Sequence, residues 1–248
     1  MGKWPIMPEH ILTEDGSHTL FSSKYNQHFH DIKTGAIKES LSKHVIPAFE
    51  YHKDKNELNI LDICFGIGYN TFSTIYYVLK NKLDVKLNIY SPELDAELIN
   101  SLDQFTFPKE FKDIKHIIKA ISKDKKYKDD FFDIEVKICD AREYIKTLKN
   151  MDIIYQDAFS SDVNNELWTV EYFKDIHEAC NEDAIVTTYS IATPVRLSMY
   201  KAGFEIYEIK PVKMKQTLGF KHKVPIDAKY IDMELKQQRN KEAKAIYD

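Results

Sequence analysis

Several features that mark other classes of protein are scarce in this sequence. Its 248 residues include only three cysteines, far apart at Cys64, Cys139 and Cys180, so we expect free thiols and no disulfide or cysteine metal site. Glycine (7) and proline (8) are few, which disfavours disorder, and no apolar run or signal-peptide pattern indicates a membrane or secreted protein. The formal charge of −4 excludes a generally basic nucleic-acid coat but not a local basic patch. We therefore expect a globular cytoplasmic protein.

Strand-like and helix-like segments alternate along most of the chain. Apolar runs that predict strands occupy residues 58–64, 85–90, 134–139, 151–156, 184–189, 204–209 and 216–220. Helical patterns separate most of them, which predicts a mostly parallel α/β sheet, and the short loop before the last run predicts an antiparallel hairpin. Such a seven-stranded sheet resembles the Rossmann-like class I methyltransferase fold. We divide the chain into an N-terminal arm, flap and helix (1–57), a methyltransferase domain (58–226) and a polar tail (227–248).

The stretch from Leu58 to Asn81 predicts a ligand cradle. An apolar strand leads into the turn FGIGYN and then into an amphipathic helix. Gly66 and Gly68 suit a turn that needs positive φ or a close approach of backbone to a ligand. The helix N-terminus beyond them favours an anionic or polar ligand. Two acids, Glu93 and Asp140, each follow a predicted strand, so we expect them at the same edge of the sheet.

This pattern, DxCFGxG over residues 62–68 followed by two acids, resembles the S-adenosylmethionine site of class I methyltransferases, with Cys64 where a glycine is usual. The resemblance implies that the turn faces the amino-acid part of the cofactor, that Glu93 binds the ribose hydroxyls and that Asp140 binds the adenine. A dinucleotide site is the competitor, but the turn lacks its third glycine. Each acid could instead complement a helix dipole. The expected cofactor-binding residues are Asp62, Phe65, Gly66, Gly68, Asn70, Glu93, Asp140 and Ala141.

Five segments in order narrow the resemblance: EDGSHTLFSS, GAIKESLSKHVI, CFGIGYNTF, QDAFSSDVNNELWT and AGFEI. Together they resemble the methyltransferase domain of the MnmC family, named for tRNA 5-methylaminomethyl-2-thiouridine biosynthesis, and its stand-alone relatives. The family turn FGxGxN is matched by Phe65, Gly66, Gly68 and Asn70. DAF stands here in place of the family's DGF-type phrase. The resemblance covers about residues 13–220.

The family implies methyl transfer from S-adenosylmethionine to the amine of 5-aminomethyl-(2-thio)uridine at the wobble position 34 of tRNA. Its larger members carry a second, flavin-dependent domain that removes a carboxymethyl group. We expect no room for that domain in 248 residues, so another enzyme would supply the aminomethyl uridine. The partners expected are therefore tRNA and such an enzyme, with no membrane and no metal.

Asp157, directly after the fourth predicted strand, is the candidate catalytic residue. An alkylamine is mostly protonated at neutral pH, and a carboxylate can bind the ammonium and then accept a hydrogen bond from the free amine. Phe159 and Trp168 are candidates for stacking on the uridine, although core packing explains Trp168 equally well. The alternative for Asp157 is a helix cap or turn residue, and its position at the end of a strand makes that the weaker interpretation.

Two further groups could contact the substrate. The segment around residues 19–30 predicts a hairpin or flap, from which Tyr25 and Gln27 are candidates, together with Glu39 of the following helix. His28, His30 and His44 are more simply surface or satisfied polar residues. The run of residues 210–223 contains five lysines and no acid, so we expect it to face tRNA, with Lys213 and Lys215 as contacts.

Two alternatives remain open. A spermidine-synthase-like aminopropyltransferase also holds an amine with an aspartate after the fourth strand, but a polyamine requires an acidic channel and tRNA a basic rim. A catalytically idle tRNA-binding protein of the same fold would not bind the cofactor.

Overall fold

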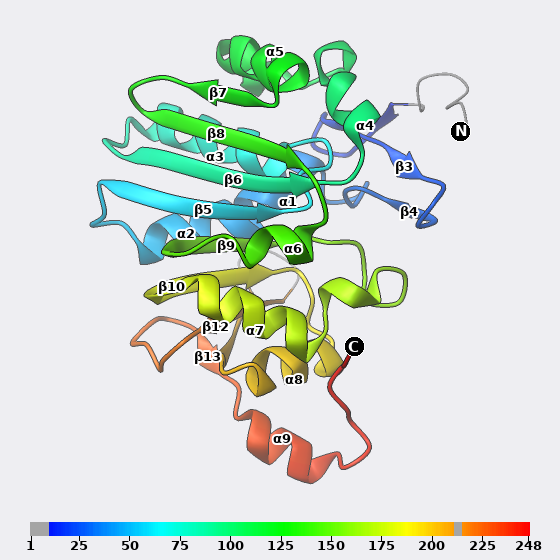
Figure 1. Cartoon of the computed structure of the whole chain (residues 1–248), viewed down its shortest axis with the longest axis vertical. Helices are drawn as coiled ribbons and strands as arrows, with labels where there is room; N and C mark the ends of the chain where they lie inside the picture. Colours follow the sequence, from blue (N-terminus) through cyan, green and yellow to red (C-terminus); the bar gives the residue numbers. More distant parts are fainter. Residues whose placement is uncertain (1–9, 211–214) are drawn as a thin grey trace.

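One large sheet organises the computed structural model, which describes residues 10–210 and 215–248 (Figure 1). Its strand order is β13-β11-β12-β10-β9-β5-β6-β8-β7. The parallel centre consists of β8 (Phe132–Ile138), β6 (Lys86–Glu93), β5 (Glu57–Ile63), β9 (Met151–Gln156) and β10 (Cys180–Thr188). On one side it continues into the antiparallel strands β12 (Gln216–Phe220), β11 (Glu205–Ile209) and β13 (Lys229–Tyr230), and at the other edge into antiparallel β7 (Lys126–Lys128).

The predicted class I methyltransferase fold is confirmed, including the antiparallel final hairpin. The seven expected strands are all present. The two additional edge strands, β7 and β13, were missed because they are three and two residues long and alternate too briefly to give a pattern. The carboxyl ends of the five parallel strands lie at one edge of the sheet, which we call the carboxyl edge; the other is the amino edge.

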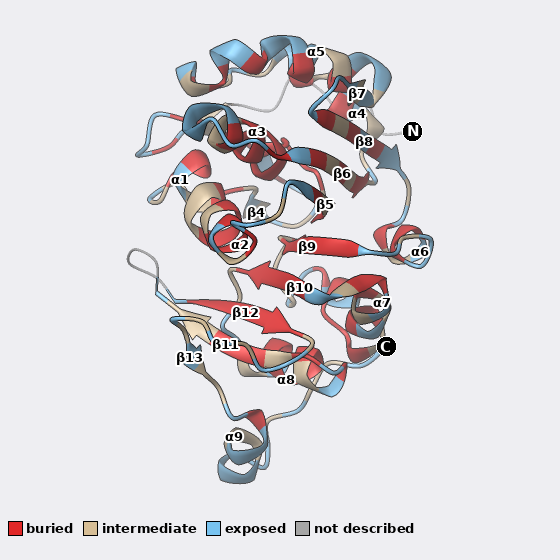
Figure 2. Cartoon of the chain, turned by 90° about the vertical axis from the view of Figure 1, so that its left-hand side faces the viewer, coloured by how far each residue is buried: buried red, intermediate tan, exposed pale blue. Residues whose placement is uncertain are grey.

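Helices cover both faces of the sheet, and alternate residues of each strand enter two separate cores. Leu58 and Ile60 of β5 join one core, and Leu61 and Ile63 join the other. Figure 2 shows the buried residues running along the central strands. Burying one such side chain stabilises the fold by roughly 1.5–3 kcal/mol, so the two cores fix the strand ends firmly in space.

The first core lies under α1 (Ala36–Ser40), a π-helical turn (Leu41–Val45), α2 (Ile46–Tyr51), α3 (Tyr69–Asn81), a 3₁₀ helix (Lys109–Ile114) and α5 (Lys115–Asp124). The second lies under α6 (Ala141–Ile145), a 3₁₀ helix (Asn165–Leu167), α7 (Val170–Ala179) and α8 (Thr193–Lys201). α4 (Ala96–Asn100) and a 3₁₀ turn (Leu102–Gln104) connect β6 to this framework. Two small hairpins precede α1: β1 (Ile11–Leu12) with β2 (His18–Thr19), and β3 (Phe21–Ser22) with β4 (Gln27–His28).

A π-helical turn separates α1 from α2 within one continuous helical segment. Pro47 explains it, because proline has no N–H to donate to the carbonyl four residues earlier, that of Lys43. The side chain of Gln216 supplies the missing donor, with Nε2 3.0 Å from Lys43 O. The chain thus stays helical through the proline, but with one widened turn.

The C-terminal segment is bound to the rest of the fold. After β13 it forms α9 (Met233–Arg239) and returns to the second core, where Val170 N donates to Ile246 O at 2.8 Å. Asp248 forms an ion pair with Arg142. Among the described residues, no helix combines the length and apolar character needed to cross a membrane.

Candidate active site at the carboxyl edge

The glycine turn connects β5 to α3 at the carboxyl edge. Gly66 and Gly68 have φ of +56° and +83°, and a Cβ at Gly68 would lie 2.6 Å from the rings of Phe65 and Phe72. Both the conformation and the space therefore require glycine at position 68. Cys64 also has positive φ, at +63°. The backbone keeps the shape of the usual glycine there, at a cost of roughly 1–2 kcal/mol.

Glu93 lies at the end of β6 beside the turn. Its Oε2 accepts a hydrogen bond from Gly66 N at 2.8 Å, and its Oε1 accepts from Leu94 N and Asp95 N, both at 2.8 Å. Burial raises the pKa of this carboxyl, which the three backbone N–H groups oppose. A carboxylate has about four acceptor positions, so one remains for a ligand hydroxyl.

Asp140 follows the neighbouring strand β8 and is exposed. Its Oδ1 caps α6 by accepting from Arg142 N at 2.7 Å, while Ala141 beside it is buried. Cys139 N donates to Glu93 O at 3.0 Å. The backbone that precedes Asp140 therefore lies directly beside Glu93. The helix-cap interpretation of Asp140 is correct for one of its oxygens, and its exposure leaves the carboxylate accessible to a ligand.

Asp62 connects the turn to α3. It is fully buried, and its Oδ2 accepts from Thr71 Oγ1 at 2.7 Å. Burial and the charge of Asp157 raise the pKa of Asp62 to about 7, although hydrogen bonds from Thr71 and Asn70 oppose the rise. Because this carboxyl is enclosed, Asp62 orients the turn.

Asp157 follows β9 and lies between two polar side chains. Its Oδ2 accepts from Asn70 Nδ2 at 2.9 Å, and its Oδ1 is 3.4 Å from His44 Nε2. Burial raises the pKa of Asp157, but the positive charge that His44 carries when protonated outweighs burial and holds that pKa below its usual value. Asn70 Oδ1 is buried without a hydrogen-bond partner. Two acceptors at this point, one ionised and one unused, fit a ligand that brings N–H donors.

The predicted hairpin over residues 19–30 is confirmed, and it lies beyond the arrowheads of β5 and β6 (Figure 1). Gln27 Nε2 donates to Ser160 Oγ at 2.7 Å, and Tyr25 stacks on Phe159 with ring centroids 4.5 Å apart. Phe29 approaches the turn, 3.1 Å from the position of a Cβ on Gly66. The hairpin therefore covers the glycine turn and the loop after β9.

Glu39 and Trp168 occupy places other than those expected for substrate contacts. Glu39 forms a mostly buried ion pair with Lys43; although burial raises its pKa, His30 and Lys43 hold that pKa far below its usual value. Trp168 is fully buried, and its Nε1 donates to Phe159 O at 2.8 Å. Stacking of Trp168 on a base is therefore wrong: it is a core residue that fixes the backbone of Phe159.

The described lysines of the basic run, on either side of β12, do not form one patch, which corrects that expectation. Strand β12 separates its two ends, because Thr217 pairs with Thr188 at the carboxyl end of β10, whereas Phe220 pairs with Ile185, nearer the start of β10. The lysines that follow β12 therefore lie at the amino edge.

Individual contacts follow from this division. Lys215, at the carboxyl edge, has its Nζ 2.8 Å from Glu208 Oε1. Lys221 and His222, at the amino edge, both pair with Glu182. The other expected contact, Lys213, lies outside the described residues.

His44 was undervalued from the sequence. It belongs to the π-helical turn, is fully buried, and faces both β10 and Asp157. A signal was present: Pro47 three residues later predicts an irregular helix, and such irregularities often occur at functional sites.

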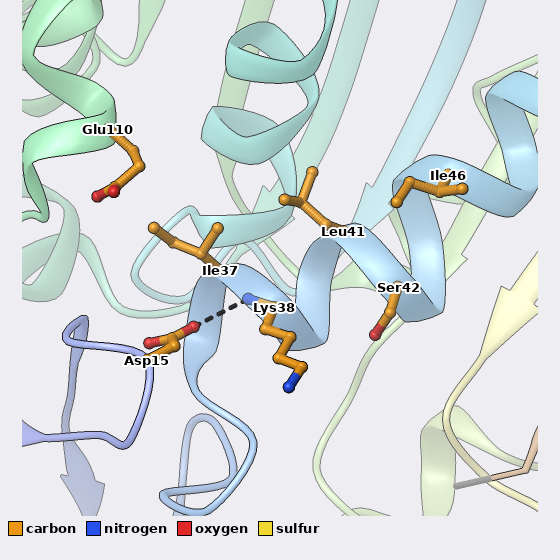
Figure 3. Close-up of a pocket in the computed structure, with 7 residues that line it drawn as sticks. All are labelled: Asp15, Ile37, Lys38, Leu41, Ser42, Ile46 and Glu110. Atoms are coloured by element: carbon orange, nitrogen blue, oxygen red, sulfur yellow. Dashed lines mark hydrogen bonds between the residues drawn. The ribbon is translucent and has the colours of Figure 1, made fainter. Parts of the chain in front are cut away.

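A shallow hollow also lies on the outer side of α1 and the π-helical turn (Figure 3). Its lining residues are Asp15, Ile37, Lys38, Leu41, Ser42, Ile46 and Glu110. None of them follows a parallel strand of the large sheet, and Asp15 is already bonded to Lys38 N at 3.0 Å. The carboxyl edge is the better candidate because its strand-end acids converge on a glycine turn.

Comparison with known proteins agrees with this geometry. Residues 108–222 match a family described as S-adenosyl-L-methionine-dependent methyltransferase. MNMC2 from Aquifex aeolicus superposes with a TM-score of 0.84 at 27% identity, covering 99% of this chain and 80% of that one. The chain is an MnmC-like methyltransferase domain.

Other relatives cover different lengths. An uncharacterized protein of Methanocaldococcus jannaschii is 30% identical over 234 residues, 89% of this chain and 61% of that protein. The MnmC protein of Paracidovorax citrulli, described as a tRNA 5-methylaminomethyl-2-thiouridine biosynthesis bifunctional protein, is 32% identical over 66 residues, 27% of this chain and 10% of its own length. The chain thus spans less than two thirds of these curated relatives.

S-adenosylmethionine is the cofactor of the MnmC-like domain, and the residues at the carboxyl edge fit it. Gly66 and Gly68 give the turn its positive φ before α3, and Glu93 and Asp140 offer acceptors at the ends of adjacent strands. The unpartnered Asn70 Oδ1 has two acceptor positions, one for the ammonium of the cofactor and one for a second ligand. The bound cofactor supplies an electrophilic methyl group on a sulfonium.

Proposed function

We propose that this chain transfers a methyl group from S-adenosylmethionine to the primary amine of 5-aminomethyl-(2-thio)uridine at the wobble position of tRNA. The product would be 5-methylaminomethyl-(2-thio)uridine. The names of the MnmC relatives suggest this nucleoside, and the polar groups around Asp157 suit its amine.

The observation that carries the proposal is the pair of acceptors formed by Asp157 and Asn70 Oδ1. An aminomethyl group arrives as an ammonium, which donates N–H bonds to both. Once it has lost a proton, its lone pair forms the bond to the methyl carbon, while the electrons of the carbon–sulfur bond stay on sulfur. The residues align donor and acceptor and need no covalent intermediate.

The hairpin residues favour a nucleoside as the acceptor. Tyr25 and Phe159 already form a stacked pair beside Asp157, and a base can stack on or between aromatic rings of this kind. Binding of the uridine would then use Tyr25, Gln27 and Phe159, with Lys215 at the rim for a phosphate.

The alternative of a small-amine transferase is supported by a different observation. Glu93, Asp62, Asp157 and Glu166 all act on Cys64, raising the pKa of its thiol further after burial. This acidic environment would attract a free diamine, and the division of the basic run leaves fewer cations at the carboxyl edge than expected.

The test is methyl transfer from labelled S-adenosylmethionine to tRNA that carries aminomethyluridine, with the nucleosides resolved afterwards. Unmodified tRNA and a free diamine are run in parallel. We expect label in methylaminomethyluridine, and its loss in Asp157→Ala. Label in the diamine alone supports the small-amine alternative; binding of cofactor and tRNA without any transfer contradicts catalysis.

A further inference from the structure

His44 and Asp157 face each other across 3.4 Å without forming a hydrogen bond: His44 Nε2 is buried and has no hydrogen-bond partner, although Asp157 Oδ1 is the nearest acidic oxygen. This gap lies beside the position where the proposed substrate would place its amine.

The other ring nitrogen determines what occupies the gap. His44 Nδ1 is 2.8 Å from Thr187 Oγ1, whose own hydroxyl has an acceptor in Ile154 O at 3.4 Å. When Thr187 donates its hydroxyl proton to Ile154 O, it accepts from Nδ1–H, and neutral His44 in this tautomer directs a bare lone pair at Asp157. Two acceptors that face each other lack one proton for a hydrogen bond.

We infer that His44 takes up, through Asp157, the proton that the substrate ammonium must lose before methyl transfer. The inference rests on the proposed function and assigns His44 as a positioning residue that completes the proton path. The ammonium donates its proton to Asp157, the proton bridges Oδ1 and Nε2, and the amine keeps its lone pair for attack. The resulting imidazolium stays paired with the carboxylate, and after turnover it returns the proton to solvent.

The other charged groups around His44 and Asp157 favour one additional proton on this pair, and not two. The titratable and charged groups near it are Lys43 and Glu39 on the helix of His44, His30 after the flap, Tyr155 on β9, Tyr189 after β10, and Asp62 on β5. Lys43 and Glu39 form an ion pair, so their charges compensate each other. Asp157 is then the anion closest to Nε2, and it stabilises one positive charge on His44.

Specific contacts within the fold hold His44 in this position. Pro47 and Gln216 produce the π-helical turn, and the widened turn carries His44. The ring is held by Thr187 on one side and lies 5.4 Å from the ring of Tyr155 on another. His44 therefore has little freedom to turn away from Asp157.

The experiment is the pH profile of kcat/KM for methyl transfer to aminomethyluridine tRNA in the wild type, His44→Gln and His52→Gln. His52 is the matched control: it is also buried and bonded to β9, but at the amino edge, through Asp152 O at 3.1 Å. We expect His44→Gln to lose about 100-fold at pH 7 and to recover toward the wild type near pH 10, because the free amine then forms without help. His52→Gln should keep the wild-type profile.

A loss that is uniform at every pH in His44→Gln would show a merely structural role and overturn the inference. If His44→Gln does not fold, Thr187→Val keeps the imidazole and removes its Nδ1 partner, and it should move the acid limb of the profile in the same direction. An unmoved limb contradicts the proposal.

A second measurement separates this inference from the proposed function. Nitrogen NMR of the chain without cofactor should show neutral His44 as the Nδ1–H tautomer, whose titration changes in Asp157→Asn but not in Asp152→Asn. An Nε2–H tautomer overturns the proton path even if the enzyme is active. Absence of methyl transfer by the wild type, with the expected tautomer present, would refute the proposed function alone.

Discussion

An aspartate lies at each end of β9, one at the amino edge and one at the carboxyl edge, and the two have different partners. At the amino edge, Asp152 at the start of β9 accepts from Lys55 Nζ, Asn59 N and Asn181 Nδ2 at 2.7–2.8 Å. At the carboxyl edge, Asp157 just after the same strand has one close donor in Asn70 and an unbonded histidine. A carboxylate with all its partners fixes structure, whereas one with unmet partners is available to a ligand.

The largest expected difference between the edges is catalytic. Asp157→Asn should lower kcat/KM for methyl transfer about 10²- to 10⁴-fold, since it removes the acceptor of the ammonium proton. Asp152→Asn should leave kcat/KM within about threefold, yet lower the free energy of unfolding by about 1–3 kcal/mol, because buried donors lose their charged acceptor. Steady-state kinetics and urea unfolding of both variants measure this. Equal catalytic losses would erase the distinction.

The second difference is the sign of pH dependence. The pKa of Asp62 is about 7 in the folded protein against about 3.9 in an unfolded chain, so its contribution to stability is complete below pH 4 and is lost as pH rises to 7. Asp62→Asn does not ionise. Between pH 4 and pH 8, the free energy of unfolding of this variant should therefore rise relative to that of the wild type by up to about 4 kcal/mol.

The control for this titration is Asp183 at the amino edge. Burial raises its pKa, but the ion pair with Lys55 outweighs burial and lowers it. The contribution of ionised Asp183 to stability is present above the pKa that it has in the unfolded chain, and it is lost as pH falls. The free energy of unfolding of Asp183→Asn should therefore fall relative to that of the wild type as pH rises from 2 to 5. Urea unfolding of both variants and the wild type from pH 2 to pH 8 is the test. If the free energies of unfolding of Asp62→Asn and the wild type change with pH in parallel, the raised pKa of the buried Asp62 carboxyl is contradicted.

A third comparison concerns two glycines with the same φ of +83°. Gly68→Ala brings a Cβ to 2.6 Å from two aromatic rings, and we expect a loss of about 2–4 kcal/mol together with weaker cofactor binding. Gly16→Ala, with nothing within 4 Å of the new Cβ, should cost only about 1 kcal/mol. Thermal unfolding and cofactor titration measure both; equal costs would mean that conformation alone requires glycine.

The smallest expected effect is on tRNA binding. If tRNA binds at the carboxyl edge, Lys215→Gln should weaken binding a few-fold and reduce the salt slope by about 1. Lys221→Gln, at the amino edge, should change neither. Binding titrations at several salt concentrations provide the test, and a reversed result would move the tRNA surface to the amino edge.

The sequence predicted the strands of the central sheet well because their apolar runs are long and separated by turn residues. The strand Met151–Gln156 was located to the residue. The glycine turn and the two strand-end acids were identifiable since the chemistry of a turn and of strand ends is local.

What the sequence could not predict depends on distant partners. The hydrogen bond from Gln216 to the π-helical turn before Pro47 joins segments that are far apart in the sequence, and no local sequence pattern predicts it. For the same reason, the burial of Trp168 and the separation of Lys215 from Lys221 across β12 appear only once the strands are paired.

The π-helical turn makes the site depend on a count of residues. A regular helix advances about 100° per residue, so deleting one residue between Leu41 and Val45 would turn everything before it by that angle relative to α2. Glu39, which precedes the turn, would then no longer lie on the side of the helix from which His44 faces Asp157. A change in the length of this helix by one residue would therefore need a compensating change elsewhere.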